Sequence, residues 1–254
     1  ILKDDYHNIS EDIEVKFFVL DDVLPPNITK SIYEEFPKDL NQYKFKNTFR
    51  EKKFTFAKVD QLPTKIISDT IDAFHLKSII QEVTKITNIF DLDPDQSLYA
   101  GGISRMDKTH YLNPHVDNSH DAKKQKYRRL NLLFYVSPDF NNEDGGNFEL
   151  WDKSVKKNIK RPAKFNRLIV METARNTWHS VDSIKSNKRR CCLSNYYFSN
   201  ISPEKKDYYH VTSFTGRPNE KFKRLFGKVD NKLRQAFANI TGVTRGNNLL
   251  RYKD

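Results

Sequence analysis

The spacing of apolar residues changes twice along this chain and divides it into three parts. In residues 1–96, a strand-like run at 14–20 precedes apolar residues at helical spacing in 29–36, 63–74 and 77–86. Residues 97–199 hold short β-branched and aromatic runs separated by turn residues, at 98–105, 130–136, 148–151, 168–171 and 190–198. Helical spacing returns at 222–237, where we expect a helix that closes the core.

Strands of this length, with few helical patterns between them, indicate a sandwich or barrel. Asp144-Gly-Gly between two of the runs is expected to form a hairpin-type turn. We therefore predict one domain, mainly β with flanking helices (α+β). Residues 1–96 would be a mixed α/β support, residues 97–199 the β-core and residues 200–254 a C-terminal helical extension.

Composition narrows the class of protein. The formal net charge of +11 suggests acidic partners, but the 44 Lys and Arg residues are spread along the chain. A solvated basic surface is therefore favoured over a nucleic-acid footprint. No apolar run is long enough to span a membrane and the first twelve residues show no signal peptide, so we expect no membrane partner. The oligomeric state is not indicated.

The two cysteines are adjacent, at Cys191 and Cys192, and there is no third cysteine to pair with either. Neighbouring residues can hardly cross-link a fold. This pattern favours a reduced, cytoplasmic protein in which both are small apolar residues of a strand, rather than redox groups.

The chemistry centres on His115-Val-Asp117. Residues two apart on a strand share a face, so this imidazole and this carboxylate can bind one metal ion. A second imidazole would complete a facial set of two nitrogens and one oxygen, which suits Fe(II) that must also bind a co-substrate and dioxygen. His179, in the β-rich part, is the candidate.

The other histidines fit such a site less well. His110 would face the opposite side of a regular strand from His115, and the rest lie in a polar loop or outside the β-core. We expect surface or structural roles for His7, His75, His110, His120 and His210.

Arg190 opens an otherwise apolar and aromatic strand, where an unpaired charge is costly. A guanidinium there suits a carboxylate through two parallel hydrogen bonds. The alternative is a surface arginine at the strand edge, which is the interpretation we favour for Arg189.

Several segments resemble, in order and spacing over about residues 98 to 199, the Fe(II)/2-oxoglutarate-dependent oxygenase superfamily and its prolyl-hydroxylase-like branch. They are 115–118, 132–136, 144–146, 165–169, 178–181 and 190–198. The resemblance implies a double-stranded β-helix (jelly roll) core, iron ligands at His115, Asp117 and His179, and a 2-oxoglutarate carboxylate on Arg190.

Further co-substrate contacts follow from the resemblance and from strand alternation. Tyr135 matches a tyrosine that hydrogen-bonds the same carboxylate in related hydroxylases, although a core aromatic fits it nearly as well. Asn131 would share the face of Tyr135, and Ser194 that of Arg190. Leu112 stands where relatives often have a tyrosine, and the interval from His179 to Arg190 is slightly long, which bears on the substrate pocket.

The resemblance implies a dioxygenase that uses Fe(II), 2-oxoglutarate and O2, with ascorbate as a possible support. It would hydroxylate a C–H bond of a small molecule or of an amino-acid or prolyl side chain, releasing succinate and CO2. Asp117 favours hydroxylation, since related halogenases carry Ala or Gly there. A non-catalytic jelly-roll module for an acidic ligand and a nucleic-acid demethylase are the alternatives, and the spread of basic residues counts against the second.

Overall fold

The computed structural model describes residues 2–7, 13–56, 64–204 and 206–241. Its centre is one curled antiparallel sheet with strand order β1-β10-β7-β12-β5-β3-β6-β11-β8-β9, to which β13, β2 and β4 add at β6, β3 and β12. The strands are β1 Phe17–Asp21, β2 Lys44–Asn47, β3 Glu51–Phe56, β4 Asp93–Pro94, β5 Gly102–Met106, β6 Tyr111–Val116, β7 Tyr127–Tyr135, β8 Phe148–Trp151, β9 Asn158–Arg161, β10 Arg167–Glu172, β11 His179–Val181, β12 Arg190–Ser199 and β13 Ser213–Phe214.

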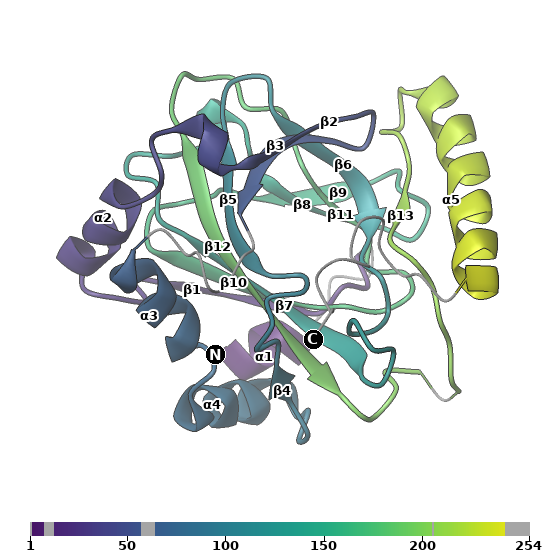
Figure 1. The fold of residues 1–254 in the computed structure, drawn as a ribbon, viewed down its shortest axis with the longest axis horizontal. Coiled ribbons are helices and arrows are strands. Elements are labelled where there is room, and N and C mark those ends of the chain that lie inside the picture. Colours follow the sequence, from purple (N-terminus) through teal and green to yellow (C-terminus); the bar gives the residue numbers. More distant parts are fainter. Residues whose placement is uncertain (1, 8–12, 57–63, 205, 242–254) are drawn as a thin grey trace.

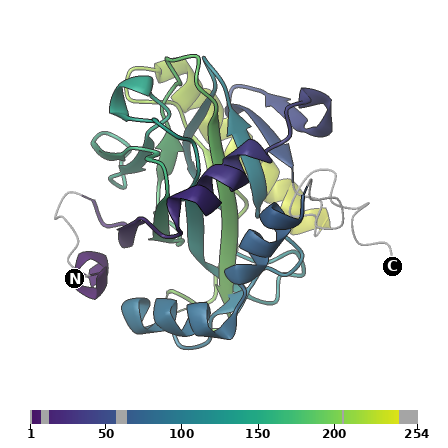
Figure 2. The ribbon, with the colours of Figure 1, turned by 90° about the vertical axis from the view of Figure 1, so that its left-hand side faces the viewer.

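Four helices precede the main run of strands and one follows it. They are α1 Leu2–His7, α2 Pro26–Glu34, α3 Lys65–Ala73, α4 Lys77–Thr87 and α5 Lys221–Thr241. Figures 1 and 2 show α2, α3 and α4 along one side of the curled sheet, whereas α5 stands at the opposite end of the molecule. Pro26 begins α2, where its missing N–H costs no helical hydrogen bond. Asn88, at φ 58°, ends α4.

Alternation along β7 separates two hydrophobic clusters. Leu130, Leu132 and Phe134 pack with residues of α2, α3 and α4 in the outer cluster. Tyr135 joins the inner cluster, formed between the two halves of the curled sheet with residues such as Phe148 of β8. The outer cluster attaches the helices and the inner one fills the curl, so every second residue of the central strands points to the interior, where a site can be built.

The predicted mainly-β fold with flanking helices is confirmed, with strands at each of the runs expected in 97–199. The hairpin expected at Asp144-Gly-Gly is wrong: β7 pairs with β10 and β12, whereas β8 pairs with β11 and β9. Gly145 and Gly146 do turn the chain, at φ 70° and 65°, but they lead it from one half of the curl to the other.

Two further differences concern the ends of the chain. The first third is more than a support, since it adds β1, β2 and β3 to the sheet. The helix predicted at 222–237 forms as α5, but most of its apolar side chains are exposed instead of being buried against the core. None of the helices in the described ranges has the length and apolar character needed to cross a bilayer.

Leu193→Ala in β12 should lower the free energy of unfolding by about 2–5 kcal/mol, because this fully buried leucine belongs to the outer cluster. Leu225→Ala on α5 is the matched control. Its side chain is 65% exposed, so the change should be about 0.5 kcal/mol or less. Urea denaturation of both variants checks this, and equal losses would contradict the assignment of the core.

Candidate metal and co-substrate site

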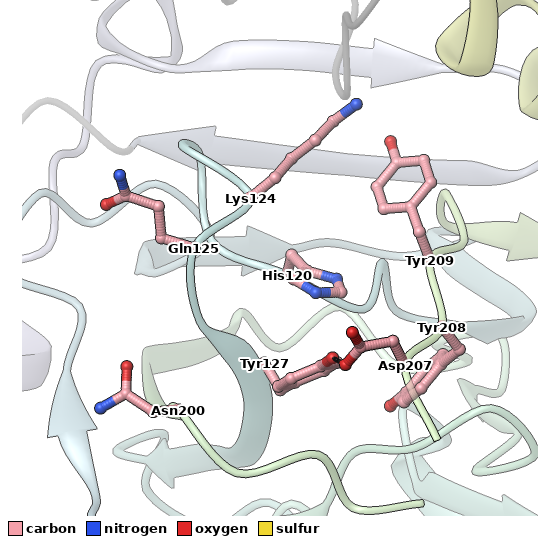
Figure 3. A pocket seen from close by; sticks show the side chains of 8 residues that line it. All are labelled: His120, Lys124, Gln125, Tyr127, Asn200, Asp207, Tyr208 and Tyr209. Atoms are coloured by element: carbon pink, nitrogen blue, oxygen red, sulfur yellow. Dashed lines mark hydrogen bonds between the residues drawn. The ribbon is translucent and has the colours of Figure 1, made fainter.

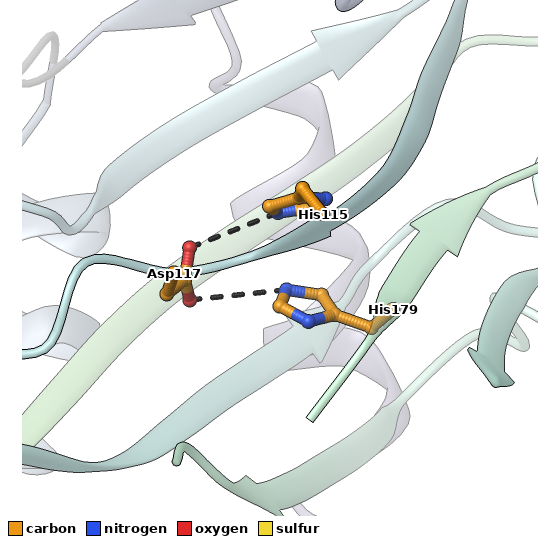
Figure 4. A group of neighbouring side chains, drawn as sticks. All are labelled: His115, Asp117 and His179. Carbon is orange, nitrogen blue, oxygen red and sulfur yellow. Dashed lines mark ion pairs between the residues drawn. The ribbon is translucent and has the colours of Figure 1, made fainter. Parts of the chain in front are cut away.

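Antiparallel pairing of β6 with β11 places His115 directly opposite His179. Their ring centroids lie 4.0 Å apart. Asp117 follows the end of β6, with its Oδ1 3.7 Å from His115 Nε2 and its Oδ2 3.8 Å from His179 Nε2. Figure 4 shows the carboxylate facing both rings. One ligand atom from each residue lies within 4.8 Å of the others, so the three side chains could hold a metal ion.

Both imidazoles are oriented by the same local device. Nδ1 of His115 is 3.0 Å from the carbonyl oxygen of Asn113, and Nδ1 of His179 is 3.0 Å from that of Thr177. Because a carbonyl only accepts, each Nδ1 carries the proton and donates it, which leaves the Nε2 lone pair directed at Asp117. Such backbone contacts fix ring orientation and tautomer before any metal binds.

The carboxylate of Asp117 is buried, and its Oδ2 has no hydrogen-bond partner among the described residues. A guanidinium nitrogen of Arg128 lies 3.5 Å from this oxygen, and Arg128 also donates to Asn118 Oδ1 at 2.7 Å. An orphaned buried carboxylate oxygen is costly unless a cation completes it. Together with two directed imidazole nitrogens, it is a donor set that fits Fe(II).

Burial and neighbouring groups together determine the protonation states of His115, Asp117 and His179. Burial, and next the neighbouring His179 ring, lower the pKa of His115 to about 3. Burial also lowers the pKa of His179. Burial alone would raise the pKa of Asp117, but Arg128 and the two imidazoles lower it well below its ordinary value. The site therefore presents two neutral imidazoles and one carboxylate, which is the protonation state a metal requires.

Arg190 points into the inner cluster and is 3% exposed. Its Nε donates to the carbonyl oxygen of Gly146 at 2.7 Å, and its guanidinium lies 4.8 Å from the ring centroid of Tyr135. No carboxylate pairs with it within the part of the chain that the structure describes. The predicted inward position is correct, and a buried guanidinium without an acid suits an anionic ligand.

Of the three remaining predicted residues, Tyr135 lies beside this guanidinium, and Asn131 and Ser194 lie on the paired strands β7 and β12. Tyr135 is fully buried, and its hydroxyl has no partner among the described residues; the same holds for the side-chain oxygen of Asn131. Register places Tyr135 opposite Cys192 and Asn131 opposite Tyr196, on strands β7 and β12. Ser194 pairs with Leu133 between them, with its hydroxyl 4.0 Å from Cys192 Sγ.

The inner cluster connects the two groups of residues. Phe148 belongs to this cluster together with Tyr135, and its ring centroid lies 5.7 Å from that of His179. The triad and Arg190 thus lie on the same interior surface of the curled sheet.

Sequence reasoning missed two residues beside the triad. Phe214 of β13 stacks on His115, with ring centroids 5.0 Å apart and 15° between planes. Arg128 is 3% exposed and covers the ring of Tyr196 at 4.4 Å. A charged residue inside an apolar strand was the signal that singled out Arg190, and it would have found Arg128 as well. No comparable pattern marks Phe214.

The histidines that were not predicted to be ligands lie outside the triad. His110 packs against the rings of Phe45 and Phe54, at 5.7 and 5.2 Å, as a structural residue. His210 is half-buried close enough to Asp117 and Arg128 for their charges to act on it, and its Nε2 has no partner among the described residues. His120, three residues after Asp117 in the sequence, lines a pocket.

That pocket has a volume of about 620 Å³. Figure 3 shows the rings of Tyr127, Tyr208, Tyr209 and His120 around it. His120 lies 4.4 Å from Tyr127, and Lys124 covers Tyr209 at 4.3 Å. The complete lining is His120, Lys124, Gln125, Tyr127, Asn200, Asp207, Tyr208 and Tyr209. Its lining thus offers aromatic faces, amides, the cation of Lys124 and the carboxylate of Asp207, which accepts a hydrogen bond from the Tyr127 hydroxyl.

Residues 101–198 match the family model described as the 2OG-Fe(II) oxygenase superfamily. A prolyl-4-hydroxylase from Pseudomonas putida shares the fold at TM-score 0.58 and 10% identity, over 78% of this chain and 99% of that one. A prolyl 4-hydroxylase from Phytophthora capsici gives 0.53 and 17%, over 88% and 70%. The carbocyclase SnoK from nogalamycin biosynthesis gives 0.56 and 10%, over 85% and 90%. No curated protein matches the chain in sequence.

His179→Ala should weaken Mn(II) binding by about a hundredfold or more, because one of three ligand atoms is lost and water replaces it. His75→Ala is the control. His75 is not part of the triad, and its Nε2 lies 3.2 Å from Asn195 Oδ1. Equilibrium binding followed by electron paramagnetic resonance measures both variants. Equal affinities would exclude His179 as a ligand.

Metal affinity should vary little with pH near neutrality. Since burial lowers the pKa of both imidazoles, Mn(II) affinity should change less than about threefold between about pH 7.5 and about pH 6, where two ordinary imidazoles would lose roughly tenfold. The unfolded chain binds protons below about pH 6.5 that the folded chain does not, so fold stability falls as the pH drops below this value. A tenfold loss of affinity centred near pH 6.5 would contradict the protonation state assigned here.

Proposed function

We propose, from the membership of residues 101–198 in the 2OG-Fe(II) oxygenase superfamily, that this protein hydroxylates an unactivated C–H bond of a small molecule or of an amino-acid or prolyl side chain. The domain makes the chain an Fe(II)- and 2-oxoglutarate-dependent dioxygenase. The observation that carries the proposal is the convergence of His115, Asp117 and His179, together with a buried arginine that pairs with no carboxylate of the described residues.

In this proposal His115, Asp117 and His179 hold Fe(II) through two nitrogens and one oxygen. Bound there with 2-oxoglutarate and O2, the iron supplies the oxidation of a substrate C–H bond, with release of succinate and CO2. The backbone carbonyls of Asn113 and Thr177 keep both Nε2 atoms directed at the ion. Arg128 holds the carboxylate of Asp117 ionised and in place.

Arg190 would bind the distal carboxylate of 2-oxoglutarate. Its Nε donates to the carbonyl of Gly146, its Nη1 lies 3.6 Å from Met106 Sδ, and its Cζ lies 4.8 Å from the Tyr135 ring centroid. The guanidinium would therefore be held in place for the carboxylate. The unpaired Tyr135 hydroxyl and Asn131 oxygen would complete contacts to the same co-substrate. Ser194 is a weaker candidate, because its hydroxyl already contacts the Cys192 thiol, at 4.0 Å.

The pocket lined by Tyr127 and Tyr208 would receive the substrate, because it contains His120, which follows Asp117 by three positions, and stacked aromatic rings that suit a bound ligand. Lys124 at its rim, and the net charge of +11, would suit an acidic substrate. The proteins with similar folds are prolyl 4-hydroxylases and a carbocyclase, which supports either a peptidyl or a small-molecule substrate. The buried free Cys191 and Cys192 support action in a reducing compartment such as the cytoplasm.

A succinate-release screen with Fe(II) and ascorbate across amino acids, prolyl peptides, nucleosides and sugar derivatives tests the proposal and narrows the substrate. Anaerobic addition of Fe(II) and 2-oxoglutarate should also give a weak visible charge-transfer band that His179→Ala abolishes. A protein that binds no Fe(II), shows no band and releases no succinate would be a non-catalytic binding module instead.

Arg190→Met should raise the KM for 2-oxoglutarate by about a hundredfold, the loss expected for a buried charge-assisted pair of roughly 2–3 kcal/mol. Arg189→Met is the matched control: Arg189 covers Tyr33 at 4.5 Å and bonds its hydroxyl at 3.2 Å on the outer side. Its KM should be unchanged. Equal effects of the two substitutions would show that Arg190 acts through stability alone, which thermal unfolding of both variants would reveal.

A further inference from the structure

Helix α5 lies at the edge of the molecule (Figure 1) and exposes a row of large apolar side chains to solvent. Seven large apolar side chains on it are between 52% and 90% exposed: Phe222, Leu225, Phe226, Val229, Leu233, Phe237 and Ile240. Large apolar side chains that are exposed side by side on one helix face mark an interaction surface.

The helix is attached to the rest of the protein by its opposite face. Gly227 and Ala238 are buried there. Asn231 both accepts from the backbone N–H of Phe214 and donates to its carbonyl, each at 2.9 Å. Gln235 accepts from the N–H of Val211 at 2.9 Å. A Cβ at Gly227 would lie 2.6 Å from the Phe214 carbonyl oxygen, so the two backbones are in close contact. This specific docking leaves the apolar face outward.

Charge on the helix is strongly one-sided. Six cations and one acid lie between Lys221 and Thr241, a difference of 6 − 1 = +5. The cations are Lys221, Lys223, Arg224, Lys228, Lys232 and Arg234. Lys221, Lys228 and Lys232 are exposed along one flank of the apolar face, and no exposed residue of α5 is acidic. The single acid, Asp230, is paired with Arg50 at 3.2 Å and Arg234 at 3.0 Å.

We propose that α5 binds the surface of an anionic lipid bilayer and lies in the plane of the interface. Its aromatic and aliphatic side chains enter the boundary between headgroups and acyl chains, and the flanking lysines meet anionic headgroups. A helix with a Phe- and Leu-rich face beside lysines has the composition of such interfacial helices. This goes beyond the oxygenase function, and it departs from the expectation that the protein has no membrane partner.

Charge and geometry favour this surface over a second copy of the chain. Two α5 faces in contact would bring lysine flanks together with no exposed acid on either helix to meet them. At 3.6 residues per turn the seven side chains cover an arc of about 120°, which is broader than the narrow seam of a coiled-coil pair. An anionic bilayer accommodates both the width of the face and its charge.

Vesicle co-flotation of the full chain tests the proposal, with phosphatidylcholine alone and with equimolar phosphatidylglycerol. Wild type should bind only the anionic vesicles. The double variant Leu233→Asp/Phe237→Asp should bind about a hundredfold more weakly, since it removes two apolar side chains that would be buried in the bilayer. Phe90→Asp is the control, because Phe90 is 82% exposed away from α5 and should bind normally.

The role of charge is tested by Lys221→Glu/Lys228→Glu/Lys232→Glu, which should weaken binding more than tenfold. Lys30→Glu/Lys38→Glu/Lys77→Glu makes the same change in net charge at exposed positions elsewhere and should have a much smaller effect. All the substituted side chains are exposed, so each variant should fold normally. Circular dichroism and thermal unfolding check this.

Three outcomes would overturn the proposal. One is absence of vesicle binding, or equal binding to both kinds of vesicle. Another is a concentration-dependent dimer in sedimentation velocity that Leu233→Asp/Phe237→Asp dissociates, which would assign the face to a second copy. The third is binding to polyglutamate in place of vesicles, which would assign it to an acidic protein. Flotation needs neither Fe(II) nor 2-oxoglutarate, so its failure leaves the oxygenase proposal untouched.

Discussion

The pairing of two short strands determines what the rest of this molecule can do. Because β6 and β11 run antiparallel with His115 opposite His179, strand pairing alone brings two imidazoles together on the inner face of the curled sheet. Each ring is then fixed by the carbonyl two residues before it. A shift of one residue in this register would turn one imidazole to the other face and separate the ligands.

Three arginines among the described residues are buried, in an environment where cations are rarely left unpaired. Arg129 pairs with Glu172 at 3.3 Å. Arg128 has acquired a carboxylate neighbour in Asp117 and an aromatic one in Tyr196. Arg190 has a carbonyl and an aromatic ring but no acid among the described residues. This asymmetry distinguishes the arginine that supports Asp117, a candidate metal ligand, from the arginine that is the candidate anion site, although both lie in strands of the same sheet.

Much of the site could be predicted from the sequence because its signals are local. Spacing of two on a strand brings His115 and Asp117 together, and a charge in an apolar strand marks Arg190. The relation between distant segments could not be read in this way. Phe214 reaches His115 through β13, a two-residue strand without a pattern of its own. Gly145 and Gly146 announce a turn but not which strands pair across it.

Helix α5 illustrates the same difference. Periodicity predicts an apolar stripe but not what covers it, and the residues that attach the helix are small or polar, such as Gly227 and Asn231. Similarly, β2 at Lys44–Asn47 has few of the β-branched residues that indicate strands, and it forms because β3 pairs with it. Tertiary contacts override local preference in both cases.

The clamp of Asn231 on Phe214 links the far end of the molecule to its centre. Phe214 is held at both backbone groups by the helix while its ring covers an imidazole of the triad. Local detachment of α5 would release that ring and admit water to His115. The helix thus acts as a buttress for the candidate metal site, and the rate at which an ion bound there would exchange with solvent should follow the opening of a helix that contributes no candidate ligand.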